Sequence, residues 1–297
     1  MLTLGLELLD ARAIAVAVDE RGDVRARASV DDANLEAAAN AAVDQAAGGS
    51  GSAPSLGVSA VSADSPSIAP VLASLARRFA GIFTEDRAIT SGAAAAVAEA
   101  WIGAAKGADD VALLAVGDHV TAGILHRGAP LLGAHGRAVS IAWLGLNPVE
   151  REDYRRVGCL EAEVAASGVV RRLIWRIKAG DQSRVQEEVA NDLSAITIDH
   201  VLDAARHGDG VSISVVRDTA KYLGMAAANL VVLADPAVIV LGGIMASAAD
   251  LLLEPVRAEI ARRLPRAMID TLAIVPAALG VDAAAIGAAR LGSAAPR

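Results

Sequence analysis

The most informative stretch of this chain reads Asn229-Leu230-Val231-Val232-Leu233-Ala234-Asp235-Pro236-Ala237-Val238-Ile239-Val240-Leu241-Gly242-Gly243. It predicts the end of a long, largely apolar helix over 211–233, an Asp-Pro turn, a strand over 237–241 and a double glycine. Because glycine has no Cβ, Gly242 and Gly243 allow backbone amides to approach a ribose or a phosphate where a strand turns into a helix. A tight turn alone would use the same two residues.

Strand and helix patterns alternate along the rest of the chain. Period-two alternation predicts short strands at 2–8, 13–18 and 24–30, followed by a helix over 31–45 and a flexible connector at Gly48–Ser52. Further elements are expected in this order: strand 56–61, helix 67–79, extended segment 87–90, helix 93–106, strands 111–116 and 122–126, helices 161–177, 183–193, 198–206 and 247–263, strand 271–275 and helix 282–291.

The length of 297 residues suits two lobes of ordinary size. The strands at 111–116 and 122–126 suggest a second β-meander like the one that opens the chain. We therefore expect an α/β protein with one lobe over 1–107 and a second lobe over 108–297. A helical insertion is expected over about 161–207 of the second lobe.

Composition excludes several classes of function. With 54% hydrophobic and 21% charged residues, the chain is expected to fold. A net charge of -8 with three Trp, two Tyr and two Phe residues disfavours a nucleic-acid surface, which combines a basic stripe with stacking rings. The apolar runs at 222–234 and 236–249 are too short to span a bilayer, so no membrane role is expected. The start of the chain does not read as a signal peptide, and the single Cys159 forms no disulfide framework, so a cytoplasmic location is expected.

Further segments keep a characteristic order around the Asn229–Gly243 stretch. They are Gly158-Cys159-Leu160-Glu161, Ala204–Asp209, Leu252–Arg257 and Ala278–Ala289. In these segments the chain resembles the ROK family (repressor, open reading frame, kinase) through its second half and more faintly through its first. The resemblance implies a two-lobed actin-like ATPase (ribonuclease H-like) fold, with a duplicated β-meander and a cleft between the lobes. It also implies a last helix, about 282–291, that packs back toward the N-terminal lobe, and a homodimer.

The resemblance places the family's catalytic Asn-Asp pair on Thr90 and Ser91, counted back from the helix Ala98-Glu99-Ala100-Trp101-Ile102-Gly103. Sugar kinases need a carboxylate there as the general base for the acceptor hydroxyl. A serine hydroxyl cannot act as a base at neutral pH, although Thr90 and Ser91 can still hydrogen-bond a sugar. A slip of one residue would give Gly92, so neither register restores the aspartate.

The phosphate loops differ from the family in the same way. The first loop, Asp-x-Gly-Gly-Thr in the family, corresponds to Glu7-Leu8-Leu9-Asp10-Ala11, which lacks both glycines and the hydroxyl. The second corresponds to Gly117-Asp118-His119-Val120-Thr121-Ala122-Gly123, where only the outer glycines remain, and it also reads as an ordinary β-hairpin. The nucleotide contacts that the resemblance still implies are Gly117, Gly123, Gly242, Gly243 and Gly280.

The sugar and zinc segments are also altered. Val139-Ser140-Ile141-Ala142-Trp143 replaces the family's Gly-Glu-x-Gly-His, so Ser140 is a candidate sugar contact and Trp143 fills the space of the histidine. Glu161 is the retained sugar ligand, although a carboxylate at a helix start also interacts favourably with the helix dipole. Of the family's zinc ligands only Cys159 remains, as a packed side chain, because Glu152 and Tyr154 occupy two cysteine positions. Structural zinc needs four ligands, so zinc is not expected.

These residues favour a sugar-kinase-like protein that has lost phosphoryl transfer and keeps small-ligand binding (sugar or nucleotide) or partner binding in a regulatory role. The first alternative is an active ATP-dependent hexose or N-acylhexosamine kinase, which would use ATP and Mg²⁺. It would need another base among Glu85, Asp86, Asp118 or Glu161. The second alternative is the family's transcriptional-regulator branch, acting without its own DNA-binding domain.

Overall fold

Alternating apolar residues near the start of the chain form an antiparallel meander, as predicted. In the computed structural model, which describes residues 2–48, 55–62 and 65–293, β1 (Thr3–Leu8) pairs with β2 (Arg12–Val18), and β2 pairs with β3 (Val24–Asp31). Strand β4 (Leu56–Ala60) joins β1 in parallel and β5 (Ile89–Thr90) joins β4 in parallel, giving the order β3-β2-β1-β4-β5. Of the predicted connector 48–52, residues 49–52 lie outside the described part of the chain.

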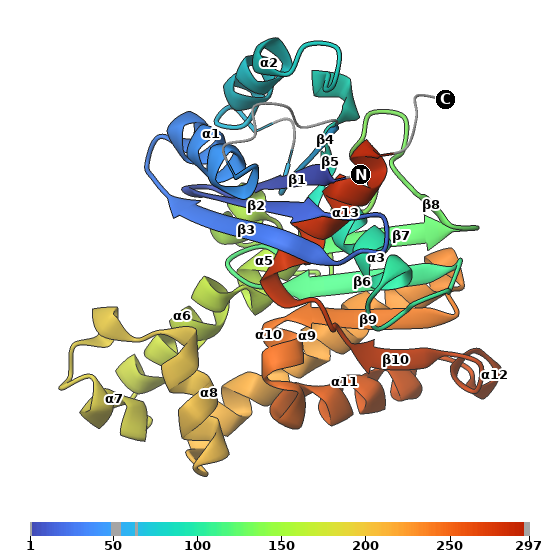
Figure 1. Cartoon of the computed structure of the whole chain (residues 1–297). Helices are drawn as coiled ribbons and strands as arrows, with labels where there is room; N and C mark the ends of the chain where they lie inside the picture. Colours follow the sequence, from blue (N-terminus) through green and yellow to red (C-terminus); the bar gives the residue numbers. More distant parts are fainter. Residues whose placement is uncertain (1, 49–54, 63–64, 294–297) are drawn as a thin grey trace. The chain divides into compact units, whose positions relative to one another are not determined.

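Helices cover both faces of this first sheet (Figure 1). On β2, Ala13, Ala15 and Ala17 pack into the cluster that contains α1 (Leu35–Ala46). The alternate residues Ile14, Val16 and Val18 pack with α3 (Ser91–Trp101) and α13 (Ala283–Gly292). The remaining helices here are α2 (Ala69–Arg78), η1 (Glu85–Arg87) and η4 (Gly280–Asp282).

Glycine allows α13 to approach its neighbours very closely. A Cβ on Gly287 would lie 1.7 Å from the Ala94 carbonyl oxygen of α3, and one on Gly5 would lie 1.9 Å from the Ala285 carbonyl oxygen. Backbone packs directly on backbone at both contacts, which fixes α13 between β1 and α3.

The second sheet repeats the strand order of the first. It contains β6 (Val111–Val116), β7 (Val120–His126), β8 (Ala129–Pro130), β9 (Val238–Gly243) and β10 (Ala273–Pro276), in the order β10-β9-β6-β7-β8. Strands β7 and β8 are antiparallel, whereas β9 and β10 are parallel. Two sheets with the same order and the same kinds of connection are the duplicated architecture predicted from the sequence.

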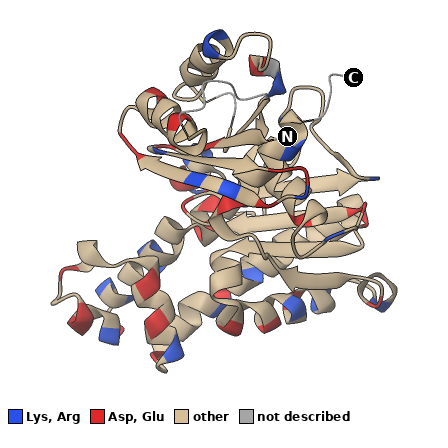
Figure 2. Cartoon of the chain, viewed as in Figure 1, with Lys and Arg blue, Asp and Glu red and all other residues tan. Residues whose placement is uncertain are grey.

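The long stretch between β8 and β10 is mostly helical. Its elements are η2 (Ile141–Trp143), α4 (Glu152–Val157), α5 (Cys159–Val164), α6 (Ala166–Lys178), α7 (Arg184–Glu188), η3 (Leu193–Ala195), α8 (Ile198–Arg206), α9 (Gly210–Ala234), α10 (Ile244–Ser247), α11 (Ala249–Arg263) and α12 (Arg266–Ile269). On α7, α8 and α11, Arg residues are intermixed with Asp and Glu, whereas the charged residues of α6 are all Arg or Lys (Figure 2). Within the described ranges, no helix combines the length and apolar character needed to cross a bilayer.

By its internal contacts the chain divides into two compact units. The first comprises 1–113, 121–139 and 277–297, and the second comprises 114–120 and 140–276.

Several predicted helices differ from the observed ones. The predicted helix 183–193 is α7 followed by the separate turn η3, and the predicted helix 93–106 ends at Trp101. Two further differences have an identifiable cause. Helix α3 begins at Ser91 rather than 93 because Thr90 caps it, its Oγ1 accepting from the Ala93 N–H at 3.4 Å. The predicted helix 161–177 is interrupted at Ala165, which has extended backbone angles. There the N–H of Ala166 donates to the Gly117 carbonyl at 2.9 Å instead of to the preceding turn.

Candidate functional site

The candidate catalytic position lies at the start of α3 in the first unit. Ser91 is 3% exposed, and its Oγ has no hydrogen-bond partner of normal geometry. The position is held by close backbone packing, because a Cβ on Gly92 would lie 2.2 Å from the Ala122 carbonyl oxygen of β7. One on Gly123 would lie equally close, 2.2 Å, to the Gly92 carbonyl oxygen. Gly123 is thus accounted for by strand packing, and its nucleotide contact stays a prediction.

Glu7 of β1 faces Ser91 from inside the same unit. Its side chain is buried, with the residue 7% exposed, and burial raises the pKa of Glu7 to about 7. The neighbouring Ser91 hydroxyl lowers this pKa, and the Asp282 carboxylate raises it. Asp282 is itself bound by Arg27, whose Nε lies 2.8 Å from Oδ1. Glu7, which the first phosphate loop contains together with Asp10, is therefore largely protonated below about pH 7.

We expect Glu7→Gln to make the stability of the protein less dependent on pH. Because the pKa of Glu7 rises from 4.5 to about 7 on folding, the folded protein binds this proton more tightly than the unfolded chain between those values. The stability contributed by the neutral carboxyl is present below the unfolded value and is lost as pH rises through about 7, by up to about 3 kcal/mol. Urea unfolding at about pH 5 and pH 8 measures this effect. The free energy of unfolding of Glu7→Gln, relative to that of wild type, should be higher at pH 8 than at pH 5.

The exposed Glu254, changed to Gln, is the control for this experiment, since its ion pair with Arg257 lies at the surface. A Glu7→Gln variant with the same pH dependence as wild type would contradict the raised pKa.

In the second unit, Glu161 holds the loop that corresponds to the second phosphate loop. Its Oε2 accepts from the Val120 N–H at 3.0 Å, and its Oε1 lies 3.2 Å from Nδ1 of His119. Gly117 closes the same loop by donating its N–H to the His119 carbonyl at 2.9 Å. Both oxygens of the predicted sugar ligand therefore have partners within the protein.

The structure brings Gly243 against this loop within the second unit. Gly243 has φ +65°, and a Cβ on it would lie 1.9 Å from the carbonyl oxygen of Val116, the residue before Gly117. Gly242 precedes it in β9, and Gly243 is the last residue of that strand. The turn therefore requires glycine at 243 for close packing. It brings the adjacent pair Gly242 and Gly243 close to Gly117, which lies far earlier in the sequence.

Gly280 lies in the first unit, after a segment that a buried carboxylate holds. Glu99 of α3 is 0% exposed; Oε1 accepts from the N–H groups of Ala278 and Leu279 at 3.0 Å each, and Oε2 accepts from the Ala104 N–H at 2.7 Å. Gly280 follows with φ +59°. Glu99 is a structural residue that was not predicted from the sequence, although a lone carboxylate in an Ala-rich helix is a signal that could have identified it.

The remaining candidates are spread along the chain. Ser140 is exposed and precedes η2. Trp143 is 59% exposed, so the expectation that it fills the histidine's space is wrong: η2 directs it outward. Of the alternative bases, Glu85 and Asp118 are exposed, and the side chain of Asp86 lies outside the described part of the structure.

The residues at the family's zinc positions do not fit that metal. Tyr154 and Cys159 pack with Ala162 in an apolar cluster, and Cys159 is buried as predicted. The Tyr154 hydroxyl donates instead to the buried Glu163 carboxylate. In the part of the chain that the structure describes, no group of three or more His, Cys, Asp and Glu side chains could hold a metal ion. A single thiol cannot supply the four ligands of structural zinc.

Purified protein is therefore expected to contain far less than one zinc per chain, as measured by inductively coupled plasma mass spectrometry. Treatment with a chelator should also leave the thermal unfolding curve unchanged, because zinc contributes to stability only where it is bound by the folded state. About one zinc per chain, or a clear drop in melting temperature with chelator, would refute the ligand assignment.

Comparison with known proteins agrees with the sequence resemblance. A glucokinase of Halalkalibacterium halodurans is 34% identical over 196 residues, covering 65% of this chain and 59% of that protein. An N-acetylglucosamine repressor of Escherichia coli O157:H7 is 30% identical over 194 residues, covering 65% of this chain and 46% of that protein. The chain thus spans about three fifths of the length of that glucokinase and less than half of that repressor.

Solved structures match over nearly the whole chain. A ROK family glucokinase from Streptomyces griseus, in complex with glucose and AMPPNP, has a TM-score of 0.81 at 25% identity and covers 98% of this chain and 99% of that one. The predicted actin-like ATPase fold is therefore confirmed. The sequence model described as "ROK family" matches residues 70–295, about three quarters of the chain, and the chain therefore belongs to the ROK family.

Proposed function

We propose that this chain is a sugar-kinase-like member of the ROK family that no longer transfers phosphate and that binds a small ligand, a sugar or nucleotide, or a partner protein in a regulatory role. One observation carries the proposal. The position that the resemblance assigns to the general base holds Ser91, which is buried and faces a carboxyl, Glu7, whose pKa burial raises to about 7. A serine there can neither take the proton of an acceptor hydroxyl nor bring a fixed negative charge.

The altered loops support the same proposal. Family kinases cradle phosphate with closely spaced glycines, whereas the first loop here is Leu8-Leu9-Asp10-Ala11. In the second loop, the Val120 N–H is a donor of the kind that such loops offer to phosphate, but here it donates to the Glu161 carboxylate. The remaining glycines, Gly117, Gly123, Gly242, Gly243 and Gly280, leave nucleotide binding as part of the proposal, together with sugar contacts at Thr90, Ser91, Ser140 and Glu161.

An active ATP-dependent hexose kinase remains the second candidate, and Glu7 is the observation that favours it. A carboxyl with a pKa of about 7 has the proton affinity suited to a general base near neutral pH, and it lies beside Ser91. The glucokinases among the relatives, and the glucokinase structure with glucose and AMPPNP, are the basis for this alternative. The regulator branch is the third candidate, based on the similar N-acetylglucosamine repressor.

The test is a coupled assay of ATP-dependent phosphorylation of glucose, mannose and N-acetylhexosamines, combined with calorimetric titration of the same sugars and of AMPPNP. Binding without turnover is the result expected of the proposed function. A homodimer and a cytoplasmic location belong to the proposal as well, and light scattering at micromolar concentration tests the dimer.

A further inference from the structure

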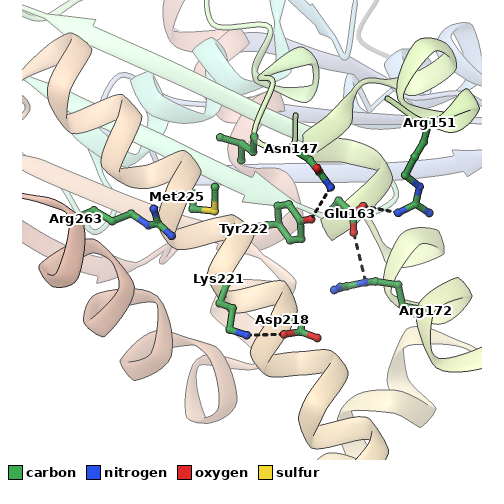
Figure 3. A pocket seen from close by; sticks show the side chains of 10 residues that line it. Asn147, Arg151, Glu163, Arg172, Asp218, Lys221, Tyr222, Met225 and Arg263 are labelled. Carbon is green, nitrogen blue, oxygen red and sulfur yellow. Dashed lines mark hydrogen bonds and ion pairs between the residues drawn. The ribbon is translucent and has the colours of Figure 1, made fainter. Parts of the chain in front are cut away.

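A pocket within the second unit is separate from the Glu161 loop and from the double glycine. It has a volume of about 500 Å³ and lies among α5, α6, α9 and the end of α11 (Figure 3). This volume is in the range typical of small-molecule sites and far exceeds that of a simple inorganic anion. Glu163 on α5 and Tyr222 on α9 lie at its centre, and Figure 3 shows Tyr222 projecting toward Asn147 and Glu163.

The charged side chains that line the pocket carry an excess of positive charge. The cations are Arg151, Arg172, Lys221 and Arg263, and the carboxylates are Glu163 and Asp218. This excess is notable because the chain as a whole carries a net charge of -8. A positive pocket in an acidic protein attracts anions specifically to that place.

Two of these arginines lack a carboxylate of their own. Arg172 shares Glu163 with Arg151: Nε of Arg172 is 3.9 Å from Oε2, whereas Nη1 of Arg151 is 3.0 Å from Oε1. The Arg172 side chain is only 13% exposed, and burial lowers the pKa of Arg172 despite the nearby Glu163.

Arg263 donates from Nε, at 3.0 Å, and from Nη2 to Oε1 of Glu259. It shares this carboxylate with the adjacent Arg262, whose Nη1 lies 3.2 Å from Oε2. Buried or half-buried cations that share carboxylates are stabilised by an additional anion.

The pocket also offers groups suited to hydroxyls and to an apolar ring face. Oε2 of Glu163 accepts no hydrogen bond from the described residues, since Arg172 Nε is too distant for one. The Tyr222 hydroxyl accepts from Asn147 Nδ2 at 3.5 Å, and a phenol hydroxyl can donate as well as accept. Tyr222 and Met225 add apolar surface on the same helix.

We propose that this pocket binds a monosaccharide phosphate. The phosphate lies against Arg263 and Lys221. The sugar hydroxyls bond Glu163 and Tyr222 at a distance from the phosphate, so the Glu163 carboxylate meets neutral hydroxyl donors and not the phosphate's negative charge. This inference goes beyond the proposed function, because it concerns a second site and holds whether or not the protein transfers phosphate.

The experiment is calorimetric titration of the full chain with glucose 6-phosphate, mannose 6-phosphate and N-acetylglucosamine 6-phosphate, with inorganic phosphate and glucose alongside. At least one sugar phosphate is expected to bind. Arg263→Gln is expected to weaken this binding at least about tenfold, the usual effect of one charge-assisted hydrogen bond. Arg262→Gln is the matched control, since it removes the same charge from the neighbouring position and also pairs with Glu259 but does not line the pocket.

Lys221→Gln is a second test of the phosphate position, because Lys221 is an exposed residue on a different helix, α9. A loss of sugar-phosphate affinity similar to that of Arg263→Gln supports the proposal. Glu161→Gln tests the other site: a sugar phosphate that lost affinity in this variant and not in Arg263→Gln or Lys221→Gln would be bound at the Glu161 loop instead. No binding of any sugar phosphate, equal losses in Arg262→Gln and Arg263→Gln, or loss in Glu161→Gln alone would each overturn the inference. Inorganic phosphate binding as tightly as the sugar phosphates would overturn the assignment of the sugar.

Discussion

Wild-type protein supplied with ATP and Mg²⁺ is expected to phosphorylate neither glucose, mannose nor N-acetylhexosamines above background, and Ser91→Asp alone is expected to leave it inactive. Phosphoryl transfer depends on positioning and charge stabilisation in one transition state. The changes at Ser91, in the loop Glu7–Ala11 and at Ser140 and Trp143 all act on that same state. Restoring one group therefore restores little of the rate.

The surroundings of Ser91 add a second reason. An aspartate at this position would face Glu7 from within a buried site, with the Asp282 carboxylate also nearby. Carboxyl groups that share one site raise one another's pKa, so the new carboxyl would be held partly neutral and would be a poor fixed charge. A general base typically contributes about 10²- to 10⁴-fold in rate, and even that gain would act on a site without its phosphate loops.

Three outcomes of this assay are informative. Ordinary wild-type turnover, on the order of 1 to 10³ per second, would mean that Ser91 is not the catalytic position. Turnover that disappears in Glu7→Gln would identify Glu7 as the base and favour the active-kinase alternative. Activity only in Ser91→Asp would mean that the phosphate loops still work despite Asp10 and His119, and that the missing base alone silences the enzyme.

Local patterns predicted most of the fold. Alternation predicted β1, β2 and β3, and the apolar run before Asp235-Pro236 predicted α9, because these elements bury one face or the whole surface of a continuous segment. The break at Ala165 could not be predicted, because its cause is a backbone hydrogen bond from Ala166 to Gly117 in a distant loop. Periodicity carries no information about such a partner.

The candidate site was less predictable than the fold for the same reason. Glu161 reads as a ligand or a helix-start carboxylate, yet its oxygens bond Val120 and lie by His119, about forty residues earlier in the chain. Glu163 reads as an ordinary helix residue, yet it is buried beneath Arg151, Arg172 and Tyr154. A carboxylate's role depends on which donors surround it in the fold, so a single sequence identifies the residue type but not its partners.

Glu99 is the clearest example, and its removal is expected to cause the largest loss of stability. Its carboxylate joins α3 to residues 278 and 279, which lie 179 and 180 positions later and lead into α13. In Glu99→Ala the N–H groups of Ala104, Ala278 and Leu279 would lose their acceptor inside the protein. Each unsatisfied buried donor costs about 1–3 kcal/mol, so the three together cost about 3–9 kcal/mol, and we expect a loss of at least about 3 kcal/mol.

Urea unfolding followed by circular dichroism measures this loss, with Glu254→Ala as the control because Glu254 is exposed and pairs only with Arg257 one turn away. The stability of Glu99→Gln should lie between those of Glu99→Ala and Glu254→Ala. Its amide oxygen can still accept from a backbone N–H, but its NH₂ group would face other N–H donors. If Glu99→Ala unfolded at the same urea concentration as Glu254→Ala, water would have to satisfy the freed N–H groups. The residues before α13 would then be held by the glycine-mediated packing of Gly287 on Ala94, and the carboxylate would not be needed.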